Sequence, residues 1–169
     1  MEDFVHLHVH TQYSILDGQA PVDKLVDKAI ANGMRGMAIT DHGNMFGVKD
    51  LFDVCNKRNK DLKKEGKEPF KPIFGCEVYV APRRKEDKDK NLDRRRYHLI
   101  LLAKNANGYR NLIQLVSRAW VDGFYNKPRT DHYDLEKFHE DIICCSACIA
   151  GEVPRAILND DIESARKSI

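Results

Sequence analysis

Phe4-Val5-His6-Leu7-His8-Val9-His10-Thr11 decides the fold of this chain, because histidine alternates there with apolar residues. A period of two is typical of a β-strand, whose successive side chains point to opposite faces. We therefore expect the three histidines to share one face of a strand, while the apolar residues between them bury the other. Neutral imidazole is the commonest metal ligand, so this pattern favours a metal site over a polar face of hydrogen-bonded histidines.

The composition limits the classes of protein that need to be considered. The 169 residues carry 28 lysines and arginines against 26 aspartates and glutamates, a net charge of +2. Such a balance predicts no bulk attraction to nucleic acid or to a membrane, so binding of either kind requires a local patch. No apolar run approaches the roughly 20 residues of a membrane span. Five cysteines without paired spacings indicate a reducing, cytoplasmic compartment.

Apolar periodicity divides the rest of the chain into alternating strands and helices. We expect strands at 36–40, 72–81, 97–103 and 142–147, and helices at 21–32, 48–65, 109–121 and 152–158, with another helix opening over 160–169. Gly33 and Gly66 are expected to end the first two helices, and Phe52 and Cys55 to point inward from the second. The alternation predicts one α/β domain, residues 1–169, with a parallel sheet.

Side chains that can carry chemistry recur at one place in these units, at a strand end or in the loop that follows it. They are His8, His10, His42, Glu77 and Cys148, joined by His98 at the start of its strand. Sites of parallel α/β folds assemble at the carboxyl ends of their strands, so we expect these side chains to converge. Imidazole, carboxylate and thiolate together favour zinc, with manganese or iron as alternatives.

The motifs around these residues resemble the PHP family of metal-dependent phosphoesterases, and within it the branch at the N-terminus of bacterial replicative DNA polymerases. They are residues 6–18 (HLHVHTQYSILDG), 38–43 (AITDHG), 75–77 (GCE), 97–99 (YHL) and 146–152 (SACIAGE). The first two motifs in this order are highly specific, whereas the short ones would carry little weight alone. The resemblance spans essentially the whole chain.

The resemblance implies a distorted (β/α)7 barrel with up to three divalent metal ions at the mouth of its strands. Carried over by position, it implies these ligands: His8, His10 and Glu77 for the first ion, Glu77, His98 and Cys148 for the second, and Asp17 and His42 for the third. His6 matches a position that is not a ligand. The family also supplies an Asp and a His beyond Ile169, so we expect a barrel truncated before its last strand or strands.

The function that the resemblance implies is hydrolysis of phosphoesters, of the 3′–5′ exonuclease type, within a DNA-directed DNA polymerase (a nucleotidyltransferase). The expected partners are DNA, the remaining polymerase domains and a proofreading exonuclease subunit, with no membrane. Two alternatives stay open: a metal-stabilised docking module without catalysis, and a phosphoesterase like the histidinol phosphatases. The polymerase reaction itself cannot be placed on this chain, since no paired catalytic carboxylates with a nucleotide pocket are seen.

Several other polar residues have an ordinary structural interpretation. Asp41 either caps the turn after its strand or positions a neighbouring imidazole. We expect His132 and His139 to be solvated. The remaining cysteines of the later strands are expected to be small buried hydrophobes: Cys76, Cys144 and Cys145.

Residues 83–96 form a charged segment between two strands, with eight lysines and arginines and four acidic residues. Such a run is typical of a solvated, mobile loop, which is the interpretation that we favour. Alternatively, Arg94, Arg95 and Arg96, which lead directly to His98, contact the phosphates of a nucleic-acid strand.

Overall fold

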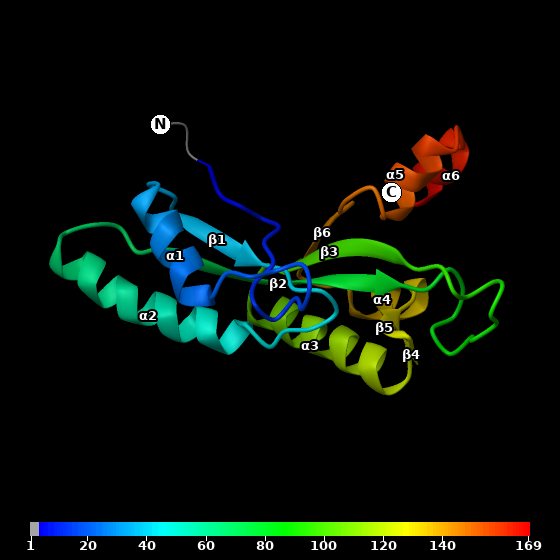
Figure 1. Cartoon of the computed structure of the whole chain (residues 1–169), viewed down its shortest axis with the longest axis horizontal. Coiled ribbons are helices and arrows are strands. Elements are labelled where there is room, and N and C mark those ends of the chain that lie inside the picture. The colour runs from blue at the N-terminus through cyan, green and yellow to red at the C-terminus, as the bar shows by residue number, and fades with distance from the viewer. Residues whose placement is uncertain (1–3) are drawn as a thin grey trace. The chain divides into compact units, whose positions relative to one another are not determined.

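A computed structural model describes residues 4–169, which divide into two compact units. Unit 1 ends at Cys76, and unit 2 spans Glu77–Ile169. The division falls inside one strand, β2 (Lys71–Val80), so each unit contains part of it. Figure 1 labels the elements along the chain. Within residues 4–169, none of the helices combines the length and apolar character that crossing a membrane requires.

Unit 1 contains α1 (Val22–Ala31), β1 (Gly36–Ile39), α2 (Val48–Lys64) and the first part of β2. The strands β1 and β2 are parallel, with Gly36 opposite Lys71. The helix α1 packs against both β1 and α2. Apolar residues at helical spacing bury the shared face, and the core consists of Val22, Val26, Ala29, Met37, Ala38, Leu51 and Cys55.

Gly33 and Gly66 end α1 and α2, as predicted. Both have positive φ angles, +77° and +70°, in the left-handed region that glycine adopts without steric cost. The backbone N–H of Met34 donates to the carbonyl of Ala29 at 3.0 Å and thereby closes the last turn of α1.

Two predictions about unit 1 are wrong. Residues 4–11 form no strand, since their one β-bridge joins His6 to Met37 and Leu7 lies in a bend. The neighbouring β1 has only four residues and cannot pair along this whole segment, and Leu7 remains 45% exposed. Phe52 is 48% exposed, because Leu51 and Cys55 take the inner face of α2.

Unit 2 follows the strand order β4-β5-β2-β3-β6. Its strands besides β2 are β3 (Tyr97–Ala103), β4 (Phe124–Tyr125), β5 (Lys127–Thr130) and β6 (Ile142–Cys145). Its helices are α3 (Ala106–Val121), α4 (His132–Phe138), α5 (Glu152–Leu158) and α6 (Ile162–Lys167). The helix α3 packs on β3 and β5, and the core includes Val78, Val80, Ile100, Leu101, Leu102, Leu112 and Leu115.

The sheet of unit 2 is mixed rather than parallel. The strand β5 is parallel to β2, whereas β6 is antiparallel to β3 and β4 is antiparallel to β5. The sequence pattern missed β4, β5 and α4, which are too short and too polar to show a period. Cys144 is exposed and Cys145 half-buried, against prediction, because β6 ends the strand order and none of its four residues is fully buried. Cys76 is buried, as predicted.

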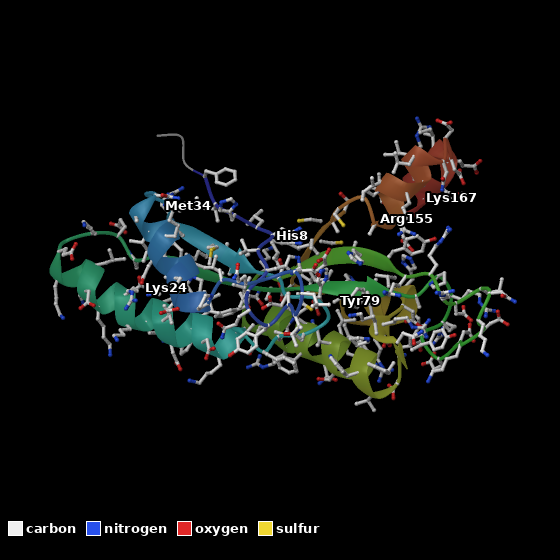
Figure 2. The ribbon with its side chains drawn as sticks, in the orientation of Figure 1. His8, Lys24, Met34, Tyr79, Arg155 and Lys167 are labelled. Atoms are coloured by element: carbon white, nitrogen blue, oxygen red, sulfur yellow. The ribbon has the colours of Figure 1, made fainter. Side chains whose placement is uncertain are left out.

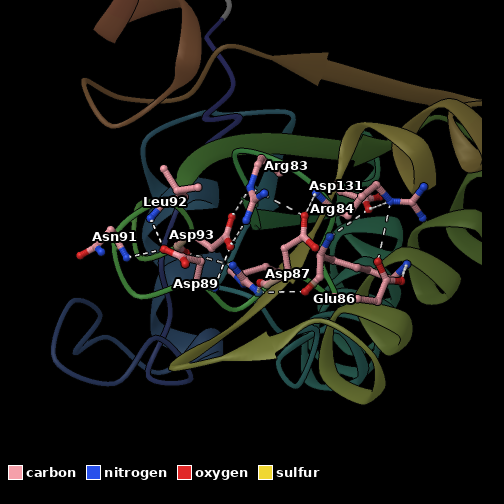
Figure 3. Close-up of polar contacts among 11 residues, drawn as sticks. Arg83, Arg84, Glu86, Asp87, Asp89, Asn91, Leu92, Asp93 and Asp131 are labelled. Carbon is pink, nitrogen blue, oxygen red and sulfur yellow. Dashed lines mark hydrogen bonds and ion pairs between the residues drawn. The ribbon is translucent and has the colours of Figure 1, made fainter.

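The charged segment at residues 83–96 is anchored, so its interpretation as a solvated loop is wrong for Lys85 and Asp93, both of which are buried. The buried guanidinium of Arg129 donates to the carbonyl oxygens of Lys85, Asp87 and Asp93 at 2.8, 2.9 and 3.0 Å. The ammonium group of Lys85 lies 3.0 Å from the carboxylate of Asp134. Figure 3 shows the polar contacts of this segment.

Asn105 caps α3 and explains why the helix starts at Ala106, three residues before the predicted start. Its side chain accepts hydrogen bonds from the N–H groups of Asn107 and Gly108. We predict that Asn105→Ala lowers the free energy of unfolding by about 1 kcal/mol, as loss of a helix cap usually does. Urea denaturation measures the change. Asn105→Asp retains the acceptor and should restore most of the stability; an equal loss in both variants would contradict the capping role.

Candidate metal centre

Four of the predicted ligands lie together in unit 1, and we call them the histidine group: His8, His10, Asp17 and His42. The Nε2 atoms of His8 and His10 are 3.0 Å apart. The ring centroids of His10 and His42 are separated by 4.2 Å. The carboxylate of Asp17 lies 2.9 Å from Nε2 of His42. His8 is labelled on the N-terminal segment in Figure 2. Three imidazoles and a carboxylate so close together form a donor set that suits a divalent ion.

The loop at residues 11–18 is held in place by the buried carboxylate of Asp41. This carboxylate accepts hydrogen bonds from the backbone N–H of Thr11 at 2.7 Å and from the Thr11 hydroxyl at 2.8 Å. It also accepts a hydrogen bond from the hydroxyl of Ser14 at 2.8 Å. Ser14 in turn contacts Nδ1 of His10 at 2.8 Å. Of its two interpretations, Asp41 therefore acts on an imidazole, through Ser14.

These contacts determine which nitrogen of His10 carries its proton. A carboxylate only accepts, so the single hydroxyl proton of Ser14 points to Asp41. The oxygen of Ser14 must then accept from Nδ1–H of His10, as it does from the backbone N–H of His42 at 3.0 Å. The other nitrogen of His10, Nε2, is left with its lone pair toward His8. That tautomer is the one a metal ligand needs.

Gly18 and Tyr13 complete the support of this loop. A Cβ atom at Gly18 would lie 1.9 Å from the carbonyl oxygen of Thr11, so only glycine allows the loop to close there and to bring Asp17 near His42. The hydroxyl of Tyr13 donates to the carboxylate of Asp50 on α2 at 2.7 Å. This hydrogen bond raises the pKa of Tyr13, because ionisation would remove the donor.

The other three predicted ligands lie together in unit 2, and we call them the glutamate group: Glu77, His98 and Cys148. The carboxylate of Glu77 on β2 lies 3.0 Å from Nδ1 of His98 on β3. The sulfur of Cys148 is 3.7 Å from the same nitrogen. Glu77 is only 1% exposed. A carboxylate buried to that degree needs nearby donors or positive charge, and a divalent cation would supply the latter.

A tight turn at residues 146–151 brings Cys148 to the start of β3. The N–H of His98 donates to the carbonyl of Ala150 at 3.2 Å, and the N–H of Ala150 donates to the sulfur of Cys148 at 3.4 Å. A Cβ atom at Gly151 would lie 2.3 Å from the carbonyl oxygen of Ser146, so the turn requires glycine there. These contacts give a structural reason for the SACIAGE motif.

The remaining candidates are placed as follows. His6 packs its ring on Phe4, with centroids 4.8 Å apart. His132 and His139 are exposed, as predicted, although His132 also pairs with Glu152. Arg94, Arg95 and Arg96 line a pocket of about 570 Å³ that also includes His98. Convergence of all seven ligands on a single site involves both units and stays a prediction, as does the role of each residue as a ligand.

Sequence reasoning missed Ser14 and Thr11 as the residues that position the histidine group. The signal was present in the first motif, where Thr11 and Ser14 stand between the last histidine and Asp17. Nothing in that motif, however, names Asp41 as their acceptor, because Asp41 lies on a different element.

We predict that Ser14→Ala weakens the binding of zinc by 10- to 100-fold, a typical loss when the hydrogen-bond partner of a metal-ligating histidine is removed. The alanine leaves Nδ1–H of His10 without its acceptor. Competition with a fluorescent zinc chelator measures the affinity. Tyr13→Phe is the matched control, since it removes a neighbouring hydroxyl that bonds to Asp50. An equal loss in both variants would contradict a specific role for Ser14.

The ion pair between His132 and Glu152 predicts a pH-dependent stability of unit 2. The carboxylate of Glu152, 3.0 Å away, raises the pKa of His132 above its ordinary value of 6.5. The stabilisation is therefore complete below pH 6.5 and disappears as the pH rises through the higher pKa of the folded state. We expect His132→Gln to lower the melting temperature at pH 6 more than at pH 8.5. His139→Gln is the control; a pH-independent effect of His132→Gln would contradict the prediction.

Comparison with known proteins assigns the chain to a family. DNA polymerase III subunit alpha of Borreliella burgdorferi is 46% identical over 167 residues, which cover 98% of this chain and 14% of that protein. The same subunit of Treponema pallidum is 46% identical over 156 residues, which cover 92% of this chain and 12% of that protein. An amidohydrolase structure from Chromobacterium violaceum aligns with a TM-score of 0.46 and 20% identity, over 68% of this chain and 32% of that one.

The chain therefore spans about one seventh of the length of the first relative. The PHP domain family matches residues 6–169, a range that crosses the division between the two units. The strands and helices of the structure confirm the predicted α/β fold class. This chain belongs to the PHP domain family.

Proposed function

We propose that this chain is part of the metal-dependent phosphoesterase domain of a bacterial replicative DNA polymerase, where it helps to remove nucleotides from a DNA 3′ end. The observation that carries the proposal is the histidine group, in which Nε2 of His10 presents its lone pair beside His8. The similarity to DNA polymerase III subunit alpha over 98% of the chain supports the polymerase context. DNA, the other polymerase domains and a proofreading subunit are the proposed partners, in the cytoplasm.

The two ligand groups fit divalent ions by the chemistry of their donors. We propose up to three ions, zinc in the first instance and manganese or iron as alternatives, with the following ligands: His8, His10 and Glu77; Glu77, His98 and Cys148; Asp17 and His42. When bound, such ions polarise a phosphoester and lower the pKa of a coordinated water. Convergence of the two groups is part of the proposal and is supported by the family match across both units.

The side chains of the chain contribute orientation and charge. Ser14 keeps the His10 ring in one tautomer and one orientation, so no binding energy is lost in selecting them. Asp17 orients His42 through the 2.9 Å contact. Glu77 is buried beside His98, and burial of a carboxylate strengthens its attraction for a cation because the local dielectric is lower than that of water.

A docking module without catalysis is the second candidate. Ile157, Leu158 and Ile162 on α5 and α6 are 51%, 63% and 49% exposed, which is a large apolar exposure for two adjacent helices. In that role, metal binding would contribute folding energy only, and the apolar helices would bind other polymerase regions or a proofreading subunit.

The experiment compares two histidines of the same segment in the intact protein. We predict that His10→Ala lowers the rate of 3′-end hydrolysis of a labelled oligonucleotide by at least about 100-fold, since it removes a proposed ligand rather than only its orientation. His6→Ala is the matched control, because His6 packs on Phe4, and it should retain activity within about twofold. Metal content and melting temperature are measured alongside.

Two outcomes would count against the proposal. Equal loss in both variants would show that the segment is sensitive for structural reasons. Wild-type protein that carries its full metal content but hydrolyses no phosphoester would instead favour the docking module.

A further inference from the structure

A pocket of unit 2 concentrates positive charge beside a proposed metal ligand. It has a volume of about 570 Å³ and is lined by Lys90, Asn91, Arg94, Arg95, Arg96, His98 and Arg155. No carboxylate is among these residues, although the whole chain carries a net charge of only +2. The pocket is thus the kind of local patch that anion binding by a nearly neutral chain requires.

The charge is not neutralised by the segment that supplies it, because the carboxylates of that segment are engaged elsewhere. They are Glu86, Asp87, Asp89 and Asp93. Asp93 pairs with Arg83 at 2.6 Å, and this guanidinium lowers the pKa of Asp93. Glu86 pairs with Lys85 at 2.8 Å, and Asp87 lies 3.7 Å from Arg83. The carboxylate of Asp89 accepts hydrogen bonds from backbone N–H groups of the turn that follows it. Figure 3 shows these contacts.

The arginines of the pocket are left with open hydrogen-bonding capacity. Within residues 4–169, Arg94, Arg95, Arg96 and Arg155 form no ion pair, in contrast to Arg83 and Arg84. Nε of Arg96 is buried and has no hydrogen-bond partner among the described residues. A buried donor in that state is costly, and an anion would remove the cost.

Two of these guanidinium groups are held by aromatic rings. The guanidinium carbon of Arg96 lies 5.5 Å from the ring centroid of Tyr79, and that of Arg155 lies 5.8 Å from the ring of Tyr97. A ring engages the face of a guanidinium and leaves its N–H edge available. Arg155, labelled on α5 in Figure 2, comes from a different element than the other arginines, so the pocket is assembled by the fold.

We propose that this cationic pocket binds the phosphates of a single-stranded nucleic acid that flank the phosphoester held at the ligands beside His98. The inference rests on the proposed function and assigns the pocket residues to the part of the strand that flanks the reacting bond. Five cations exceed the charge of one phosphate, and 570 Å³ exceeds its size, so a free phosphate or a small monoester would leave most of the pocket unused. Planar guanidinium groups suit phosphate oxygens in pairs.

The test measures binding of a fluorescent single-stranded oligonucleotide to this chain by anisotropy, in EDTA and at several salt concentrations. EDTA removes divalent ions, so the binding that is measured depends on the cationic pocket and not on the proposed metal sites. We expect Arg94→Gln/Arg155→Gln to weaken binding by at least tenfold at low salt, and to reduce the slope of log affinity against log salt by about 0.7 per lost charge. The matched control is Arg110→Gln/Arg166→Gln, which removes the same charge at two exposed positions and should change affinity less than twofold.

The outcomes separate this inference from the proposed function. If the wild type does not bind the oligonucleotide, or if both double variants weaken binding equally, the pocket is not a nucleic-acid site. Either result leaves the proposed metal ligands untouched. Equally tight binding of poly-glutamate would show that the pocket takes an acidic protein instead. Specific weakening in the pocket variant, together with unchanged melting temperature, would support the inference even if the chain hydrolysed no phosphoester.

Discussion

The hydrogen bonds that the buried carboxylate of Asp41 accepts are the interaction on which the histidine group depends. Burying a carboxylate is costly unless donors replace the water that it loses. Here Thr11 and Ser14 provide three donors, and hydrogen bonds to a charged group are worth about 1.5–3 kcal/mol each. The loop cannot move away from β1 without breaking them. Because the same Ser14 hydroxyl meets His10, the stability of the loop and the tautomer of the imidazole have one cause.

In unit 2 the buried guanidinium of Arg129 holds a segment in place, as the carboxylate of Asp41 does in unit 1. Burial lowers the pKa of Arg129, and the nearby carboxylate of Asp93 opposes that effect. Its guanidinium gathers three carbonyl oxygens of the segment at residues 83–96. A rigid fork of five donors suits this task better than an ammonium group would. Arg129 therefore fixes the backbone of this segment. The three arginines between Asp93 and β3 form no ion pair among the described residues.

In both units, residues that only support the backbone hold the proposed metal ligands in position. The proposed ligands of unit 1 stand on a loop that is closed by Gly18, and Cys148 of unit 2 stands on a turn that is closed by Gly151. Ligands on loops gain precision only from such supports, because a loop has no hydrogen-bonded ladder of its own. The cost of this arrangement is that a substitution at a supporting residue alters a site that it does not touch.

The sequence by itself determined most strands and helices, the glycine ends of α1 and α2, and the family. Periodicity and motifs carry this information because they depend on residues close together in the chain. Only the tertiary structure decided that β6 is antiparallel, that Phe52 and Cys144 are exposed, and that Asp41 sets the tautomer of His10. It also decided that Arg155 joins Arg94, Arg95 and Arg96 while Asp93 turns inward. The reason is physical: the pairing of a charge and the direction of a hydrogen bond depend on partners that folding alone brings into contact.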